Sequence, residues 1–156
     1  MKALITGSNG FVGSYLRHEL EQNGYEVIGL DLVADEQTVK ADLLDPVRLA
    51  EAVRTVAPNM VFHLAGQASV APSWKIPLRT FELNVLAAIN LMDAVRAFKP
   101  STRMVLVGSS DQYGFLGEVG EGITETMCLQ PQTPYAVSKR AQEEMAGIYV
   151  LSLIHI

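Results

Sequence analysis

Cysteine, basic charge and long apolar runs are all scarce in this sequence. Its 156 residues include one cysteine, Cys128, which excludes an internal disulfide framework and suits the reducing cytoplasm. No apolar run has the length of a membrane span, and because the first predicted strand begins at residue 3 we expect no signal peptide. A formal net charge of −5 without a basic stripe argues against nucleic acid as a partner. The three histidines show no metal-ligand spacing, so we expect a cytoplasmic protein without a metal site.

Short apolar runs alternate with longer amphipathic stretches along the whole chain. The length and the 49% hydrophobic content are those of one soluble globular domain. We predict strands at 3–6, 25–30, 39–41, 60–64 and 104–107, and helices at 11–23, 46–57, 79–98 and 135–150. Alternation of this kind implies right-handed crossovers and an α/β fold, a Rossmann-type doubly wound parallel sheet with strand order 3-2-1-4-5.

A glycine-rich turn joins the first predicted strand to the first predicted helix. Gly7, Gly10 and Gly13 recur at three-residue spacing within MKALITGSNGFVG. Gly7 permits the tight turn, Gly10 lets the backbone approach an anion, and Gly13 lets helix and strand pack closely. Because the first N–H groups of a helix are unpaired and its dipole attracts negative charge, this end predicts a pyrophosphate site.

Asp31 lies at the end of the second predicted strand. A carboxylate there accepts hydrogen bonds from the hydroxyls of an adenosine ribose and repels a 2′-phosphate. We therefore expect NAD rather than NADP as the cofactor. A solvated acidic turn that also contains Asp35 and Glu36 is the other interpretation.

Tyr135 and Lys139 lie four residues apart on one predicted helix, so they share a face. A tyrosine has an ordinary pKa of about 10, so acid–base chemistry near neutral pH needs a nearby ammonium that favours the phenolate. Lys139 supplies that charge, and Pro134 places the pair at the start of a helix, where the dipole also favours an anion. Such spacing is common on helix surfaces and is weak by itself.

Three polar residues, Ser109, Ser110 and Asp111, follow the fifth predicted strand. Ligands of doubly wound sheets bind at the carboxyl ends of strands, so the Ser109 hydroxyl is placed to bind a substrate oxygen at the carbon that exchanges hydride. The alternative is a turn that only ends the strand.

Taken together, these motifs resemble the extended short-chain dehydrogenase/reductase family, which includes the NAD-dependent epimerases and dehydratases. The resemblance covers residues 1–150 and includes the glycine spacing, Asp42-Leu43, His63-Leu64-Ala65-Gly66, Asn84, Ser109 to Gly114 and Tyr135-Ala136-Val137-Ser138-Lys139. It implies catalytic roles for Ser109, Tyr135 and Lys139, and a supporting role for Asn84. The cofactor residues it implies, with those of the glycine turn, are Gly7, Asn9, Gly10, Phe11, Val12, Gly13, Asp31, Asp42, Leu43, Leu64, Ala65, Gly66, Tyr135 and Lys139.

Within this family the chain is similar to enzymes that process GDP-mannose and its 4-keto-6-deoxy product, so a GDP-linked hexose is the expected substrate. The 4,6-dehydratases carry a glutamate base where this chain has Asp111, whose shorter side chain reaches less far toward a C5 proton. The 4-keto reductases begin this motif with Gly-Ser-Ser, as this chain does with Gly108-Ser109-Ser110. This similarity favours reduction of GDP-4-keto-6-deoxymannose as the reaction. The alternatives are a GDP-mannose 4,6-dehydratase, another nucleotide-sugar 4-epimerase or dehydratase, and a non-catalytic dinucleotide sensor. Many relatives use NADP and have no acidic residue at the position of Asp31.

Trp74 is the one tryptophan, and we expect it in a loop. It and Ser110 are the candidate substrate contacts. For Trp74, packing at the active-site mouth and packing at the edge of the core are equally compatible with the sequence.

Residues 151–156 read LSLIHI, which matches the translated end of a transposon adapter used in sequencing-library preparation. An ordinary apolar helix end or strand is the alternative. Family members are considerably longer, so the resemblance implies that residues 1–150 are an incomplete NAD(P)-binding domain without its C-terminal substrate domain. It also implies a homodimer for the full-length protein. We expect the chain alone to be inactive and poorly soluble, because its sheet would end in an unpaired edge.

Overall fold

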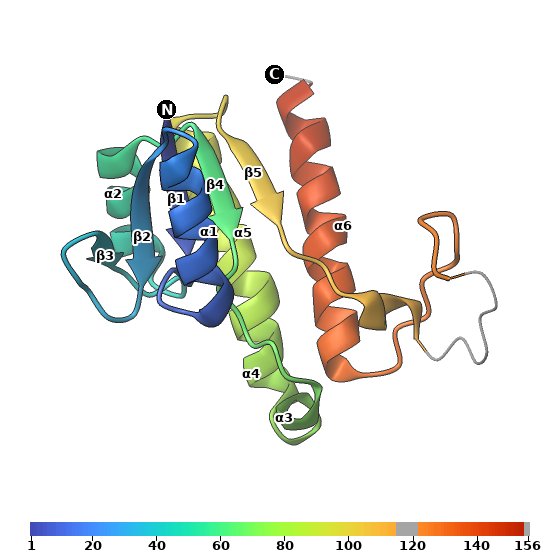
Figure 1. Cartoon of the computed structure of the whole chain (residues 1–156). Helices are drawn as coiled ribbons and strands as arrows, with labels where there is room; N and C mark the ends of the chain where they lie inside the picture. Colours follow the sequence, from blue (N-terminus) through green and yellow to red (C-terminus); the bar gives the residue numbers. More distant parts are fainter. Residues whose placement is uncertain (115–121, 155–156) are drawn as a thin grey trace.

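A five-stranded parallel sheet forms the centre of the molecule (Figure 1). The computed structural model describes residues 1–114 and 122–154. The strand order is β3-β2-β1-β4-β5, and all neighbouring strands run parallel. The predicted fold class and strand order are confirmed. The strands are β1 (Lys2–Thr6), β2 (Glu26–Asp31), β3 (Thr38–Lys40), β4 (Met60–His63) and β5 (Arg103–Leu106).

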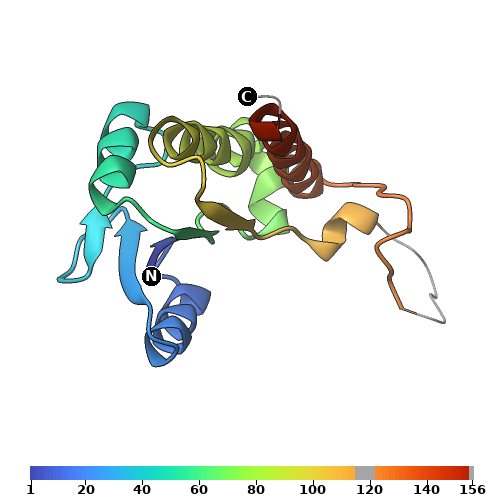
Figure 2. The same cartoon turned by 90° about the horizontal axis from the view of Figure 1, so that it is seen from above.

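Helices cover both faces of the sheet, but unequally. Figure 2 shows α1 on one face, with α2, α5 and α6 on the other. In chain order the helices are α1 (Phe11–Gln22), α2 (Pro46–Val56), α3 (Val70–Lys75), α4 (Pro77–Phe81), the π-helix η1 (Glu82–Leu86), α5 (Ala87–Phe98), the 3₁₀-helix η2 (Ser110–Tyr113) and α6 (Pro134–Ile154). Within the described residues, each of them is too short or too polar to cross a bilayer.

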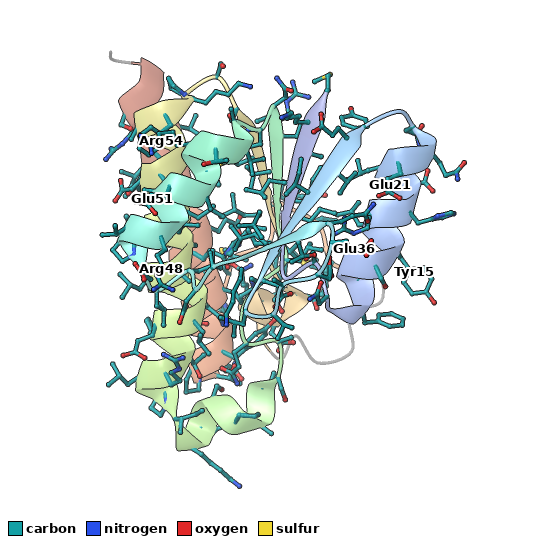
Figure 3. The ribbon with its side chains drawn as sticks, turned by 90° about the vertical axis from the view of Figure 1, so that its left-hand side faces the viewer. Tyr15, Glu21, Glu36, Arg48, Glu51 and Arg54 are labelled. Atoms are coloured by element: carbon teal, nitrogen blue, oxygen red, sulfur yellow. The ribbon has the colours of Figure 1, made fainter. Side chains whose placement is uncertain are left out.

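The core follows from the alternation of side chains along the strands. Leu4, Leu30 and Val61 face α2 and α5 and pack against Leu49 and Leu91 in the larger cluster. The smaller cluster lies under α1 and is made of Ala3, Ile5, Leu20 and Val27. Charged and aromatic side chains of the outer helix surfaces point into solvent, among them Tyr15, Glu21, Arg48, Glu51 and Arg54 (Figure 3).

The start of α2 is specified locally. Its N-cap residue, Asp45, accepts a hydrogen bond from the Arg48 N–H at 3.1 Å, and Pro46 occupies the first turn. The helix ends at Val56, and Ala57 turns the chain with a left-handed φ of 47° before Pro58. The predicted start and end of this helix are confirmed to within one residue.

Two expectations about local structure are wrong. Trp74 lies in the short helix α3 rather than in a loop. The single helix predicted over 79–98 is three consecutive segments, α4, η1 and α5, because the backbone widens to a π-helix around Asn84. In strand β4, Val61 and His63 are buried, whereas Met60 and Phe62 are half-buried, since α1 covers only part of the second face.

The predicted tail at 151–156 is only partly described. Residues 151–154 continue α6, whereas 155 and 156 lie outside the described residues.

Candidate functional site

The turn between β1 and α1 accepts only glycine at two positions. Gly7 has a φ of +71°, and a Cβ there would lie 2.8 Å from the backbone nitrogen of Ala65. A Cβ on Gly13 would lie 2.6 Å from the carbonyl oxygen of Gly7. The first turn of α1 therefore packs directly on the backbone of the glycine turn, as the spacing predicts.

The N-terminus of α1 is left free for a ligand. Gly10 is its N-cap residue; among the residues that the structure describes, no side chain caps the helix there, and its first turn has no acidic residue. The first N–H groups of α1 consequently face the space beyond the sheet. A helix end of this kind binds phosphate oxygens through its N–H groups and its dipole.

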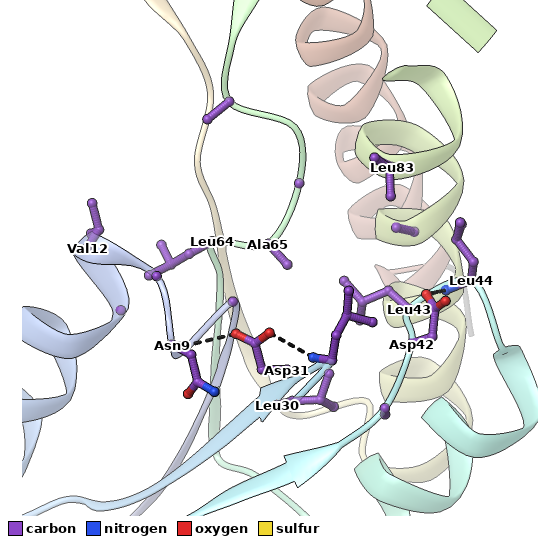
Figure 4. A pocket seen from close by; sticks show the side chains of 18 of the residues that line it. Asn9, Val12, Leu30, Asp31, Asp42, Leu43, Leu44, Leu64, Ala65 and Leu83 are labelled. Carbon is purple, nitrogen blue, oxygen red and sulfur yellow. Dashed lines mark hydrogen bonds between the residues drawn. The ribbon is translucent and has the colours of Figure 1, made fainter. Parts of the chain in front are cut away.

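A cavity of about 620 Å³ opens at this helix end, beyond the carboxyl ends of β1, β2 and β4 (Figure 4). Its volume is in the range of small-molecule sites. Of the residues predicted to bind the cofactor, all but Tyr135 and Lys139 line it. These lining residues are Gly7, Asn9, Gly10, Phe11, Val12, Gly13, Asp31, Asp42, Leu43, Leu64, Ala65 and Gly66. Sequence reasoning missed seven further lining residues: Leu30, Leu32, Ala41, Leu44, Ala68, Leu83 and Ala87. Leu83 and Ala87 could have been predicted as a pair, because apolar residues four apart lie on the same face of a helix.

Backbone N–H groups fix two carboxylates at the edge of this cavity (Figure 4). Asp31 accepts hydrogen bonds from the N–H of Asn9, to Oδ2 at 3.0 Å, and from that of Leu32, to Oδ1 at 2.7 Å. Asp42 accepts one from the Leu44 N–H at 2.9 Å. Each carboxylate keeps lone pairs for further donors, such as ligand hydroxyls.

Tyr135 and Lys139 lie in the first turns of α6, and neither lines the large cavity. Tyr135 is buried. The ammonium of Lys139 donates to Gln142 Oε1 at 2.8 Å, and burial lowers the pKa of Lys139. Lys139 lines a second cavity, of about 360 Å³, between α6 and the end of β5.

The residues after β5 form a short helix rather than an open turn. Ser109 is the N-cap of η2, and its Oγ accepts a hydrogen bond from the Asp111 N–H at 3.2 Å. Ser110 is the first residue of η2. Trp74 is 62% exposed on α3 and lines neither cavity.

Asn84 connects the segment after β4, which lines the large cavity, with helix α6, which carries Tyr135 and Lys139. Its side-chain Nδ2 donates to Ser138 Oγ on α6 at 2.9 Å and to the Gln67 carbonyl at 3.2 Å. Its Oδ1 accepts from the Gln67 N–H at 2.8 Å. A buried amide on η1 thus ties the helix of Tyr135 and Lys139 to the segment that lines the large cavity.

His63, the last residue of β4, is fully buried. Its Nδ1 lies 2.7 Å from the Thr6 hydroxyl, while its Nε2 has no partner within the described part of the chain. Burial, helped by the nearby Lys139 charge, lowers the pKa of His63 to about 4, so the ring is neutral at pH 7.

Outside residues 115–121 and 155–156, no three His, Cys, Asp or Glu residues are grouped as metal ligands, and His155 lies outside the described residues.

Several known proteins are similar to this chain in sequence and in fold. The family model of the NAD dependent epimerase/dehydratase family matches residues 3–152. GDP-6-deoxy-D-mannose reductase of Pseudomonas aeruginosa is 33% identical over 144 residues, which are 92% of this chain and 45% of that protein. GDP-mannose 4,6-dehydratase of Yersinia enterocolitica is 31% identical over 160 residues, covering 88% of this chain and 42% of that protein.

A solved structure agrees with the sequence matches. The crystal structure of UDP-glucose 4-epimerase from Thermus thermophilus in complex with NAD has a TM-score of 0.90 at 34% identity, covering 98% of this chain and 52% of that chain. The chain spans less than half the length of the two curated relatives above. The family match extends over nearly all of it, and the chain therefore belongs to the NAD dependent epimerase/dehydratase family.

Proposed function

We propose that this chain is the cofactor-binding and catalytic part of an NAD(P)-dependent enzyme that reduces the 4-keto group of GDP-4-keto-6-deoxymannose. One observation carries the proposal. The glycine turn, the end of β2 and the segment after β4 line a single cavity, and Asn84 links that segment to the helix of Tyr135 and Lys139.

The large cavity fits a dinucleotide. The free N-terminus of α1 would hold the pyrophosphate, with Phe11 and Val12 in its first turn. Asp31 would accept hydrogen bonds from the adenosine ribose hydroxyls, which favours NAD over NADP. Asp42 and Leu43 would flank the adenine, and Leu64, Ala65 and Gly66 would line the remainder.

The catalytic residues would act at the keto group. When bound, the reduced nicotinamide supplies the hydride to C4. The Ser109 hydroxyl would donate a hydrogen bond to the keto oxygen, and the Tyr135 hydroxyl would give it a proton. The Lys139 ammonium would favour the phenolate left on Tyr135 and hold the nicotinamide ribose. Ser110 and Trp74 would contact the sugar nucleotide.

Reductase is preferred to dehydratase for two reasons. The chain is 33% identical to a GDP-6-deoxy-D-mannose reductase and carries the Gly108-Ser109-Ser110 sequence. Dehydratase is the second candidate, supported by 31% identity to a GDP-mannose 4,6-dehydratase, although the Asp111 side chain is shorter than the glutamate of those enzymes. In that case Asp111 would be the base at C5. A 4-epimerase is a further alternative, and a dinucleotide sensor would not need Ser109, Tyr135 and Lys139 together. We also propose a cytoplasmic homodimer for the full-length protein.

The test is an assay of the complete open reading frame that contains these residues. We expect reduced cofactor to be consumed with GDP-4-keto-6-deoxymannose and not with GDP-mannose. Tyr135→Phe should lower kcat at least about a hundredfold, because general-acid catalysis contributes that much. Tyr149→Phe is the matched control on the same helix, since its hydroxyl binds Asp93 far from the site.

The outcomes separate the candidates. Loss of water from GDP-mannose without net consumption of cofactor would indicate the dehydratase. Turnover unchanged by Tyr135→Phe would refute the mechanism, and NAD binding without turnover of either sugar nucleotide would indicate the sensor.

A further inference from the structure

A chain of hydrogen bonds runs from the middle of α1 to the carboxylate of Asp31. The Arg17 guanidinium donates to the Thr38 hydroxyl at 3.3 Å and to Gln37 Oε1 at 3.2 Å. The Thr38 hydroxyl donates in turn to Asn9 Oδ1 at 3.4 Å. The backbone N–H of Asn9 donates to Asp31 Oδ2, so the chain ends at the carboxylate that borders the large cavity.

The same network holds the segment between β2 and β3. Asn9 Nδ2 donates to the Val33 carbonyl at 3.1 Å, and the Gln37 N–H donates to Asp35 at 2.8 Å. Thr38 is buried, whereas Asn9 and residues 32–37 are exposed. Exposed segments keep one geometry only when something fixes them, and here the fixed point is the buried Thr38 hydroxyl.

Gly29 shows that the sequence leaves room for this network. A Cβ at Gly29 would collide with the hydroxyls of Ser8 and Thr38 and with the Arg17 guanidinium. Three side chains from α1, β3 and the glycine turn therefore meet over one residue of β2. Any larger residue would force them apart.

We infer that Arg17 and Thr38 are positioning residues for cofactor choice. They hold Asn9, and through it Asp31, so that the carboxylate faces the ribose hydroxyls of NAD and blocks the 2′-phosphate of NADP. Arg17 serves this role rather than binding phosphate itself, because its guanidinium is directed to Thr38, Gln37 and the Val27 carbonyl. The inference rests on the NAD site proposed above.

The experiment takes the complete open reading frame that contains these residues as the parent chain and measures, by calorimetry, the dissociation constants of NAD and NADP for it and for its variants. Thr38→Val keeps the shape of the side chain but removes the hydroxyl. We expect it to weaken NAD binding about fivefold, the value of one hydrogen bond, without weakening NADP binding. Thr38→Ser keeps the hydroxyl and should leave both dissociation constants at the parent values. Arg17→Met should weaken NAD binding without weakening NADP binding, as Thr38→Val does. Thr55→Val is the control, since that exposed hydroxyl on α2 binds only the Glu51 carbonyl.

The ratio of the two dissociation constants decides the result. A fall of about fivefold in the preference for NAD with Thr38→Val and Arg17→Met, but not with Thr38→Ser or Thr55→Val, supports the inference. Equal weakening of NAD and NADP would indicate a merely structural role and overturn it. A parent chain that binds NAD with a ratio unmoved by either variant overturns this inference alone. A parent chain that binds no NAD overturns the proposed cofactor site as well.

Discussion

His63 ends β4 with its ring buried against the Thr6 hydroxyl, and its pKa is lowered to about 4. The folded protein therefore holds the neutral ring, whereas the unfolded chain binds a proton at this histidine below about pH 6.5. Because the unfolded state takes up the extra proton, the free energy of unfolding falls as the pH drops through this range.

We predict that the contribution of His63 to stability is complete above pH 6.5 and is lost between pH 6.5 and about 4. The loss amounts to about 3 kcal/mol. Urea unfolding at several pH values measures it, and His63→Gln should remove that part of the pH dependence. His18→Gln, on the exposed face of α1, is the control and should leave the parent slope. The same slope in His63→Gln and the parent would contradict the burial argument.

The Asp31 carboxylate shows how far single residues could be predicted from the sequence. Its place at the end of β2 followed from strand periodicity and the glycine spacing, both of which are local. Its hydrogen bonds to Asn9 and Leu32 depend on how a distant turn packs against the strand, and no local pattern encodes that packing. Asn84 is similar, because its links to Gln67 and Ser138 join segments far apart in the sequence.

At the scale of elements, the glycine turn and α1 behave as one unit. The helix begins at Phe11 because Gly13 allows its first turn to lie on the carbonyl oxygens of Gly7 and Ser8. The contact leaves no space for a side chain, and it brings the free helix end to the cavity.

Two glycine-to-alanine changes should therefore have opposite effects. Gly13→Ala should destabilise the protein by about 3 kcal/mol, because its methyl would overlap backbone oxygens. Gly147 is an exposed position of α6 with open space around it, so Gly147→Ala should stabilise the protein by about 0.5–1 kcal/mol. Chemical denaturation of both variants checks the pair. Equal effects at the two positions would show that Gly13 is not held against the turn.

Elements with strong local signals were predicted well, and the others were not. Pro46 and Asp45 specified the start of α2. The short helix α3 was missed because six residues that include a proline give no periodic signal. The π-helix η1 was missed because apolar spacing continues through it, and only the packing around the buried Asn84 marks its position.

At the scale of the whole molecule, the layers are unequal. Helices α2, α5 and α6 cover one face of the sheet, while α1 covers only part of the other (Figure 2). Strand β5 forms one edge of the sheet, and Val105 in that strand is 40% exposed. An apolar edge strand is a template for association with other chains.

We predict that Val105→Lys raises the saturation concentration of the chain several-fold, because a charge on an edge strand opposes edge-to-edge pairing. Val47→Lys makes the same chemical change at an exposed position of α2 and should have a much smaller effect. Solubility by precipitation and centrifugation compares the two variants. An equal gain for both would indicate a general effect of charge rather than of the sheet edge.

The account depends most on the dinucleotide cavity, and one measurement tests it directly. The backbone amide resonances of the isotope-labelled complete protein that contains these residues are followed during titration with NAD. We predict shifts at residues 10–13, 31–32 and 64–66, which line the cavity, and little change in α2 or the outer face of α6. Shifts confined to other regions, or none at millimolar NAD, would contradict the proposed site.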